Sequence, residues 1–327
     1  MKLIIQIPCY NEAATLPVTL ASLPREVVGV ECVEWLVIDD GSEDDTAQVA
    51  KDCGVDYVVR HARNLGLARA FLTGLDACLQ LGAGVIVNTD ADNQYSAEDI
   101  PALVAPIIDG SAEIVVGARP IESIAHFSPV KKLLQRIGSW AVRVASNTDV
   151  PDAPSGFRAI SAEAARRLMV FNDYTYTLET IIQAGQKNMA ITSVPVHVNP
   201  DLRASRLVRS TASYIRRNIV TMLRIFMIYR PVRFFGFFGG ALFVIGFLIG
   251  CRFLWHYSHG HGNGHVQSLI LAAIFLGMGF QTGLVALLAD LAAANRRLIE
   301  DVRSRVQEIS VQRADGGLKK YSMSGQR

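Results

Sequence analysis

Two carboxylates separated by one residue follow a short apolar run in this chain. Asp90 and Asp92 stand just beyond the run at 85–87, and an amide follows at Gln94. Such a run predicts a buried strand, and open α/β sheets bind ligands beyond the carboxyl ends of their strands. Hard cations such as Mg²⁺ and Mn²⁺ prefer oxygen ligands and share them with substrate phosphates. The pattern indicates a site for a metal ion and a diphosphate, with turn chemistry as the alternative for an isolated aspartate pair.

Four other places where short apolar runs end also carry polar or charged side chains: Glu12, Asp39 to Ser42, Arg63 to Asn64, and Arg119. Each has a structural alternative as a turn, a helix cap or a solvated loop residue. Their joint placement at successive strand ends favours a common function. We therefore expect them to line one edge of a sheet.

The elements that must position these groups follow from the apolar runs. Strands are predicted at 3–7, 35–38, 57–59, 85–88, 114–117 and 191–198. Helical stretches alternate with them, so the fold class is α/β, with a parallel sheet and crossover helices. Pro195 interrupts the last run, which indicates a strand at the sheet edge.

Composition excludes several classes of protein. Half of the 327 residues are apolar and the formal net charge is only +2, which excludes a disordered chain and gives no global basic field for nucleic acid. The five cysteines have no paired spacing. Reduced thiols are therefore favoured over a disulfide framework or a zinc site.

The apolar excess lies in the last third of the chain. Residues 234–255 are apolar except for Arg252, and residues 266–289 carry no charge. Each segment exceeds the roughly 20 residues that a membrane-spanning helix needs. The preceding stretch, 210–229, has an apolar and a basic face, as an interfacial helix does. Gly246 and Gly250 have a spacing that suits helix pairing within the chain or in a homo-oligomer.

These patterns divide the chain into four parts: a large domain at 1–209, interfacial helices at 210–230, a two-helix transmembrane hairpin at 231–292, and a C-terminal helix and tail at 293–327. Arginines precede the first span and follow the second, whereas no Lys or Arg follows Arg252 in the connection. By the positive-inside rule, the large domain and both termini lie on the cytoplasmic side of the inner or cytoplasmic membrane.

The ordered motifs resemble those of family 2 glycosyltransferases, most of all the polyprenyl-phosphate sugar transferases of the dolichyl-phosphate mannosyltransferase group. The resemblance covers about residues 1–210. The motifs that carry it are Pro8-x-Tyr10-Asn11-Glu12, Asp39-Asp40-Gly41-Ser42, Asn64-x-Gly66, Asp90-Ala91-Asp92-x-Gln94 and Ser155-Gly156-Phe157.

This resemblance implies a GT-A fold of Rossmann-like type, a nucleotide-diphosphate sugar and a divalent metal, Mg²⁺ or Mn²⁺. It implies Asp92 and Gln94 as metal ligands. The nucleotide-sugar-binding set that it implies is Pro8, Tyr10, Asn11, Glu12, Asp39, Asp40, Arg63, Asn64, Asp90, Ala91, Asp92 and Gln94. The motifs encode neither the sugar nor the choice between UDP and GDP.

A phosphate acceptor ionises near neutrality and needs cations rather than a strong base. We expect Arg119, Lys131, Arg136 and Arg206 to contact it, and Asp90, Asp92, Arg119, Lys131 and Arg136 to form the catalytic set. Lysines stand at 131 and 132 where the resembling group usually has arginine, and lysine binds phosphate as a point charge. A solvated helix face is the alternative, and for Lys132 it is as well supported as a function.

Two acidic residues have open roles. Asp152 lies in the turn-rich loop before Phe157, where it orients the donor sugar or a basic partner, or belongs to a helix-capping turn. Glu179 faces the sugar or, as the favoured alternative, is a solvent-exposed or capping residue.

The function expected from these residues is transfer of a sugar from a nucleotide diphosphate to a polyprenyl phosphate (undecaprenyl or dolichyl) at the cytoplasmic membrane face, with inversion. One alternative is a glycolipid or polysaccharide synthase, although Gln135, Arg136 and Trp140 lack the Gln-x-x-Arg-Trp spacing of processive synthases. Another is a non-catalytic membrane-anchored scaffold that binds nucleotide sugar. A dinucleotide oxidoreductase is disfavoured, because no Gly-rich turn follows the first strand.

Overall fold

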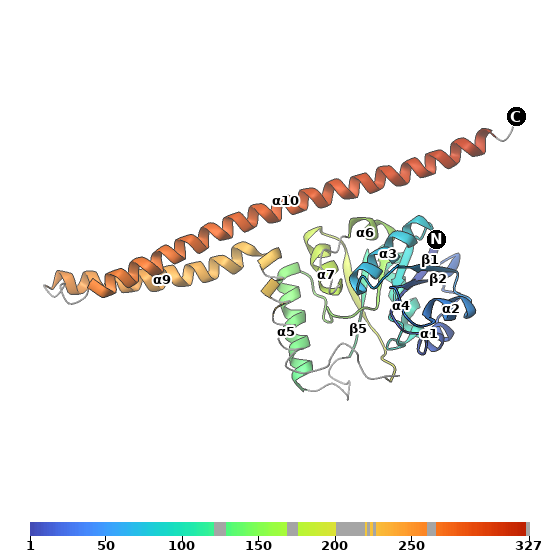
Figure 1. The fold of residues 1–327 in the computed structure, drawn as a ribbon, viewed down its shortest axis with the longest axis horizontal. Helices are drawn as coiled ribbons and strands as arrows, with labels where there is room; N and C mark the ends of the chain where they lie inside the picture. The colour runs from blue at the N-terminus through green and yellow to red at the C-terminus, as the bar shows by residue number, and fades with distance from the viewer. Residues whose placement is uncertain are drawn as a thin grey trace. The chain divides into compact units, whose positions relative to one another are not determined.

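The computed structural model describes residues 1–120, 129–168, 176–200, 220, 223–224, 227–259 and 266–324 (Figure 1). The chain divides into two compact units, Met1–Ile215 with Arg303–Arg327, and Arg216–Val302. The amphipathic helix expected at 210–229 falls largely outside the described residues.

Seven strands of the first unit form one sheet in the order β3-β2-β1-β4-β6-β5-β7. Their bounds are β1 Lys2–Cys9, β2 Cys32–Asp39, β3 Tyr57–Arg60, β4 Val85–Asn88, β5 Ile114–Ala118, β6 Arg158–Ser161 and β7 Ile191–Pro195. All four residues of β4 are buried, as expected of a strand covered on both faces. The six predicted strands are all present, and β7 lies at an edge as predicted.

The sheet is mixed, so the prediction of a wholly parallel sheet is wrong. β6 runs antiparallel to β4 and to β5, while the other neighbouring pairs are parallel. β6 is only four residues long and begins with an arginine, so it carries no apolar run that predicts a strand. Because β6 runs against its neighbours, the loop that enters it lies at the edge where the other strands end.

Helices cover both faces of this sheet (Figure 1). Their bounds are α1 Leu16–Ser22, α2 Thr46–Asp52, α3 Leu67–Gln80, α4 Ile100–Ile108, α5 Pro129–Ser146, α6 Ala162–Arg167 and α7 Thr177–Gln186. Leu3, Ile5 and Ile7 of β1 pack into a core cluster with buried residues of α1, α2 and α4. On the other face α3 lies so close to the sheet that a Cβ atom at Gly74 would overlap Gln6.

The second unit contains α9, Pro231–Ser258, and the part of α10, Val266–Ser324, that lies within it. Both helices are long and apolar enough to cross a membrane, over Pro231–Ser258 and Val266–Asn295. Only 11% and 17% of their most apolar windows are buried within the structure. The two apolar helices expected from the sequence are therefore present, and most of their apolar surface faces outward.

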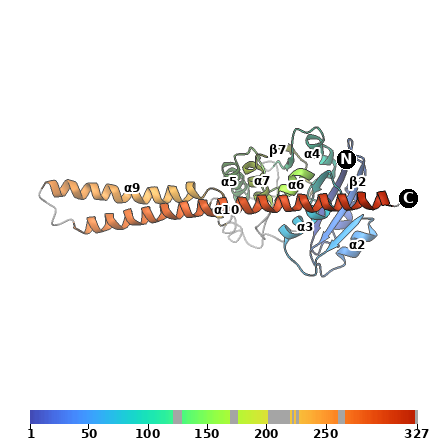
Figure 2. The same cartoon turned by 90° about the horizontal axis from the view of Figure 1, so that it is seen from above.

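Glycines bring α9 and α10 into direct contact, and the two helices lie side by side (Figure 2). A Cβ atom at Gly246 would lie 2.8 Å from the backbone nitrogen of Leu276, and one at Gly279 would lie 2.8 Å from that of Phe243. A Cβ atom at Gly240 would meet nothing within 4 Å. Small residues at such points allow helices to pack closely in lipid.

We expect Gly246→Leu to separate α9 from α10, because any side chain there must displace the backbone of α10. Overpacking of this kind costs about 1–3 kcal/mol, so the melting temperature of the full chain in detergent should fall by several degrees. Gly240→Leu, six positions before Gly246 on the same helix but facing open space, is the matched control. Equal melting temperatures for the two variants would contradict this packing.

Candidate active site

The loops after β1 and β2 are tied together by hydrogen bonds. The N–H of Asn11 donates to Ser42 Oγ at 2.9 Å, and the N–H of Glu43 donates to Asn11 Oδ1 at 2.8 Å. Asn11 has φ of 55°, a left-handed conformation that asparagine adopts more readily than most residues. Glu12 is buried, and its carboxylate accepts a hydrogen bond from Thr15 Oγ1 at 2.6 Å. The two loops therefore form one fixed wall of the sheet edge.

The neighbouring carboxylates of Asp39 and Asp40 have different partners. Asp39 is fully buried at the end of β2; its Oδ1 accepts the N–H of Ser42 at 2.9 Å, and its Oδ2 lies 3.0 Å from Arg60 Nε. Asp40 instead accepts the N–H groups of the loop after β3 at residues 65 and 66, and pairs with His61 Nδ1 at 2.7 Å. Asp40 thus orders the loop that carries Arg63 and Asn64.

Gly41 allows this loop to approach. Its φ is 70°, and a Cβ atom there would overlap the backbone of Arg63. Arg63 and Asn64 themselves are exposed, as is Tyr10, while Pro8 is buried at the end of β1. These exposed side chains therefore lie at the sheet edge on loops that buried groups hold in place.

The loop from Asp90 to Tyr95 follows β4. The carbonyl of Ala91 accepts a hydrogen bond from Thr19 Oγ1 at 2.9 Å, which fixes the loop against α1. Burial raises the pKa of Asp90 to about 7, with the charge of Asp92 as the second cause. Arg119 and Arg158 oppose that rise. The region thus concentrates negative charge that a bound cation would neutralise.

A divalent cation fits the oxygen donors of this loop. Asp92 and Gln94 are both half-buried, and Asp92 Oδ1 accepts the N–H of Gln94 at 3.2 Å. Mg²⁺ at phosphate sites commonly takes one or two protein oxygens and completes its coordination with water and phosphate. Within the described ranges no cluster of three or more His, Cys, Asp or Glu side chains offers a closed protein cage. The donors suit a cation that is shared with a diphosphate.

The segment after β7 clamps this loop, which the sequence did not indicate. Asn199 donates its backbone N–H to the carbonyl of Gln94 at 2.9 Å, and its side-chain amide to the carbonyls of Asn93 and Tyr95 at 3.0 and 3.3 Å. His197 adds a second tie, because its N–H and its ring both bond the carboxylate of Asp99 just beyond the loop. The segment therefore acts as a frame for the proposed metal ligands.

We expect the His197 tie to weaken as pH rises. Its hydrogen bond with Asp99, and then the charge of that carboxylate, raise the pKa of His197 above 6.5. The stabilisation is thus fully present below pH 6.5, the ordinary value, and is lost as pH passes through the raised pKa. His197→Gln should therefore melt below the wild type in acid and at the same temperature in alkali. A difference that is constant from pH 5 to pH 9 would contradict this account.

Arg119 and Asp152 form a buried ion pair. Arg119 Nε donates to Asp152 Oδ2 at 2.7 Å and Nη2 donates to Oδ1 at 3.0 Å, with side chains 7% and 1% exposed. Burial alone would lower the pKa of Arg119, but Tyr95 and the carboxylates of Asp152 and Asp90 hold it above its ordinary value. Of the alternatives open for Asp152, the structure supports orientation of a basic partner. One edge of the Arg119 guanidinium, formed by Nε and Nη2, is therefore already bonded to Asp152.

A fully buried arginine holds the loop between Asp152 and β6. Arg158 donates to the carbonyls of Ala153 and Ser155 in that loop, and to the carbonyl of Thr177 and the hydroxyl of Thr180 on α7. Gly156 then lies against the loop after β4: a Cβ atom there would sit 3.1 Å from both carboxylate oxygens of Asp90. The motif around Ser155 and Phe157 therefore belongs to the same site as Asp90.

The remaining predicted cations are not all described. Arg136 is exposed on α5. The side chain of Lys131 and the whole of Arg206 lie outside the described residues. Glu179 is 7% exposed in the first turn of α7, so a solvent-exposed side chain is excluded, whereas the capping and sugar-facing alternatives for Glu179 both stay predictions.

These features define a class of protein. The sheet is mixed, and acidic loops, an Asp-x-Asp pair and a buried arginine lie together at its strand ends. This arrangement is typical of GT-A glycosyltransferases, and the comparisons with known proteins agree with that class. Residues 4–169, just over half of the chain, match the family described as glycosyl transferase family 2. The chain belongs to this family and is a glycosyltransferase.

Several relatives have assigned activities. The UDP-N-acetylglucosamine–dolichyl-phosphate N-acetylglucosaminyltransferase of Methanococcus voltae is 29% identical over 212 residues, which cover 58% of this chain and 82% of that protein. The undecaprenyl-phosphate mannosyltransferase of Micrococcus luteus is 28% identical over 207 residues, 60% of this chain and 83% of that protein. The resemblance to polyprenyl-phosphate sugar transferases is thus confirmed.

Solved structures share the fold. Glucosyl-3-phosphoglycerate synthase from Mycobacterium tuberculosis, in a complex with Mn²⁺, uridine diphosphate and glucosyl-3-phosphoglycerate, has a TM-score of 0.55 and 24% identity. The similarity covers 68% of this chain and 79% of that one. It confirms the GT-A fold that the sequence predicted.

Proposed function

We propose that the chain transfers a sugar from a nucleotide-diphosphate sugar to a polyprenyl phosphate. The observation that carries this proposal is the gathering of the Asp90–Gln94 loop, the Arg119–Asp152 pair and the Ser155–Phe157 loop at one sheet edge, in a chain with two long apolar helices. The names of the relatives from Methanococcus voltae and Micrococcus luteus support the lipid phosphate as acceptor.

The donor occupies the edge formed by the first four strands. Pro8, Tyr10, Asn11, Glu12 and Asp39 form the wall against which the base and ribose bind. Asp40 holds the loop that presents Arg63 and Asn64. The diphosphate is assigned to the loop of residues 90–94, where Asp92 and Gln94 would hold Mg²⁺ or Mn²⁺ and Asp90 and Ala91 would border the nucleotide.

Transfer breaks the bond between the anomeric carbon and the diphosphate oxygen, and the nucleotide leaves with the electron pair. A phosphate oxygen of the acceptor attacks the same carbon from the opposite side, so the configuration inverts. A cation held by Asp92 and Gln94 would supply Lewis-acid stabilisation of the leaving diphosphate. Asp90 and Asp92 thus belong to the catalytic set through the leaving group.

The acceptor arrives as an anion and must approach a second anion. Arg119, Lys131, Arg136 and Arg206 are the cations that we assign to it, and preorganised charges of this kind stabilise a transition state without reorganisation. Asp152 prepares Arg119 for this role, since it fixes the Nε and Nη2 edge at 2.7 and 3.0 Å.

The proposed anchor accounts for the location of the reaction. A polyprenyl chain stays in the bilayer and presents its phosphate at the interface. We assign α9 and the first part of α10 as the two spans, within a hairpin at 231–292. The arginine distribution supports a cytoplasmic location for residues 1–209 and both termini.

The test uses the full chain in lipid nanodiscs and a panel of UDP- and GDP-sugars. Polyprenyl phosphate and 3-phosphoglycerate serve as alternative acceptors, with Mg²⁺, Mn²⁺ or EDTA. We expect a lipid-linked sugar with one donor, loss of product in EDTA, and no product with the soluble phosphate. Product only with 3-phosphoglycerate would overturn the lipid acceptor. A longer glycan would support a polysaccharide synthase, and donor binding without product in any combination would support a scaffold.

A further inference from the structure

Helix α5 presents an unusual outer face. We define the α5 outer face as Arg136, Ile137, Trp140 and Arg143, which follow one another around the helix. Trp140 is 55% exposed and Ile137 is 41% exposed, and Arg136 is exposed as well. The opposite side of the same helix is fully buried at Ala141, Val142 and Ala145. α5 therefore packs firmly into its unit and still turns a tryptophan and an isoleucine outward.

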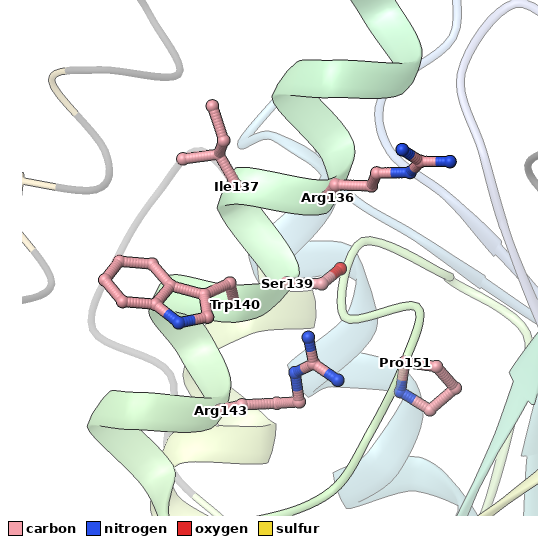
Figure 3. Close-up of a pocket in the computed structure, with 6 residues that line it drawn as sticks. All are labelled: Arg136, Ile137, Ser139, Trp140, Arg143 and Pro151. Carbon is pink, nitrogen blue, oxygen red and sulfur yellow. The ribbon is translucent and has the colours of Figure 1, made fainter.

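The two arginines border a hollow beside this face. A cavity of about 450 Å³ is lined by the four residues of the α5 outer face together with Ser139 and Pro151. Arg136 and Arg143 point from the helix toward the side of Pro151, while Trp140 and Ile137 point toward the other side (Figure 3). Cationic groups and apolar groups thus occupy adjacent strips of one surface.

The charge of the helix has one sign. Pro129–Ser146 contains Lys131, Lys132, Arg136 and Arg143 and no acidic residue. Exposed faces of globular helices normally carry charged and polar side chains. A basic face that also exposes Trp and Ile is typical of helices that lie in the headgroup region of a bilayer. Arginine suits this location because its stem packs on apolar groups while its head meets phosphate.

The proposed membrane spans of the chain keep α5 close to a bilayer. If α9 and α10 span a bilayer, as proposed above, the unit that contains α5 stays within tether length of a lipid surface. Tethering converts a weak contact into an intramolecular one with a high effective concentration. A nucleic acid does not fit, because the net charge of the chain is only +2.

We infer that the α5 outer face docks onto the headgroup layer of a bilayer that contains anionic lipids. Arg143 contacts lipid phosphates, and Trp140 and Ile137 insert at the boundary between headgroups and acyl chains, while the neighbouring Arg136 keeps its proposed role at the acceptor phosphate. The inference rests on the proposed membrane anchor and not on sugar transfer. It concerns bulk lipid rather than the acceptor molecule.

The test reads the fluorescence of Trp140 in the full chain. Trp255, which lies on α9, is replaced by Phe; Trp35 is 7% exposed and remains as a constant background. The protein is placed in nanodiscs of phosphatidylcholine alone or mixed with phosphatidylglycerol, with and without brominated acyl chains. We expect a blue-shifted Trp140 emission that brominated lipid quenches, more strongly in the anionic nanodiscs.

Arg143→Gln should shift the balance from docked to undocked by on the order of fivefold, the effect of about 1 kcal/mol per basic residue at an anionic surface. Arg166→Gln on α6 is the matched control and should leave quenching unchanged. The Trp140→Phe variant shows which part of the fluorescence comes from Trp140. These readings require no turnover, so they stand apart from the test of the transfer reaction.

Three outcomes would overturn the inference. If acrylamide quenches Trp140 and brominated lipid does not, the side chain is exposed to water. Trp140 shielded from both quenchers contacts protein, such as a second copy of the chain. Equal quenching in neutral and anionic nanodiscs, unchanged by Arg143→Gln, would show that anionic lipid plays no part.

Discussion

Replacing Asp92 by Asn is expected to lower the turnover number by about 10²–10³-fold, because the carboxylate that holds the cation beside the diphosphate becomes neutral. The variant should keep its fold, since Asp92 is half-buried and asparagine can still accept the N–H of Gln94. Rates should be measured in nanodiscs over a Mn²⁺ titration. The half-saturating metal concentration should rise along with the loss of rate.

Glu98→Gln is the control for this variant. Glu98 is an exposed acid six residues further along the chain, so its replacement makes the same change in charge away from the proposed ligands. It should retain the rate and metal dependence of the wild type. If Asp92→Asn turned over normally at low Mn²⁺, the metal role of Asp92 would be refuted.

Asp152→Ala is expected to destabilise the first unit by about 3–5 kcal/mol, because it leaves the guanidinium of Arg119 buried without its carboxylate. For a unit of this size the melting temperature should fall on the order of 10 °C. Near-ultraviolet circular dichroism of the full chain in detergent measures the transition.

Asp149→Ala provides the matched comparison, since Asp149 is exposed three residues earlier and its removal should change the melting temperature little. Asp152→Asn keeps the shape of the side chain. It should fold better than the alanine variant yet lose acceptor turnover, because a neutral amide orients Arg119 less firmly. Unchanged melting for Asp152→Ala would mean that the pair contributes nothing to stability.

The sequence predicted those parts of the fold that depend on local pattern. Apolar runs predicted six of the seven strands, because a sheet covered on both faces requires them. The runs could not reveal β6, whose first residue is the buried Arg158 and whose place between β4 and β5 depends on tertiary contacts. α4 contains two prolines and still forms, because Pro101 is tolerated in the first turn and Pro106 lies near the helix end.

The candidate site likewise contains residues that the local sequence reveals and residues that only the tertiary contacts reveal. Asp90, Asp92 and Gln94 stand out because they follow a strand directly. The clamp made by Asn199, about a hundred residues away, leaves no such trace. For Asp152 the sequence offered a basic partner as one alternative, but only the structure identifies that partner as Arg119, 33 positions away. Asp40 was noticed for its type, but only the structure shows that its carboxylate serves the loop of residues 61–66.

The anchoring of Arg158 has a thermodynamic consequence for donor binding. Its guanidinium fixes the carbonyls of Ala153 and Ser155 from within the core, so this stretch of backbone loses its conformational entropy when the protein folds rather than when the sugar arrives. Preorganisation of this kind leaves more of the interaction energy available as affinity. Any induced ordering that accompanies catalysis must then come from other segments of the chain.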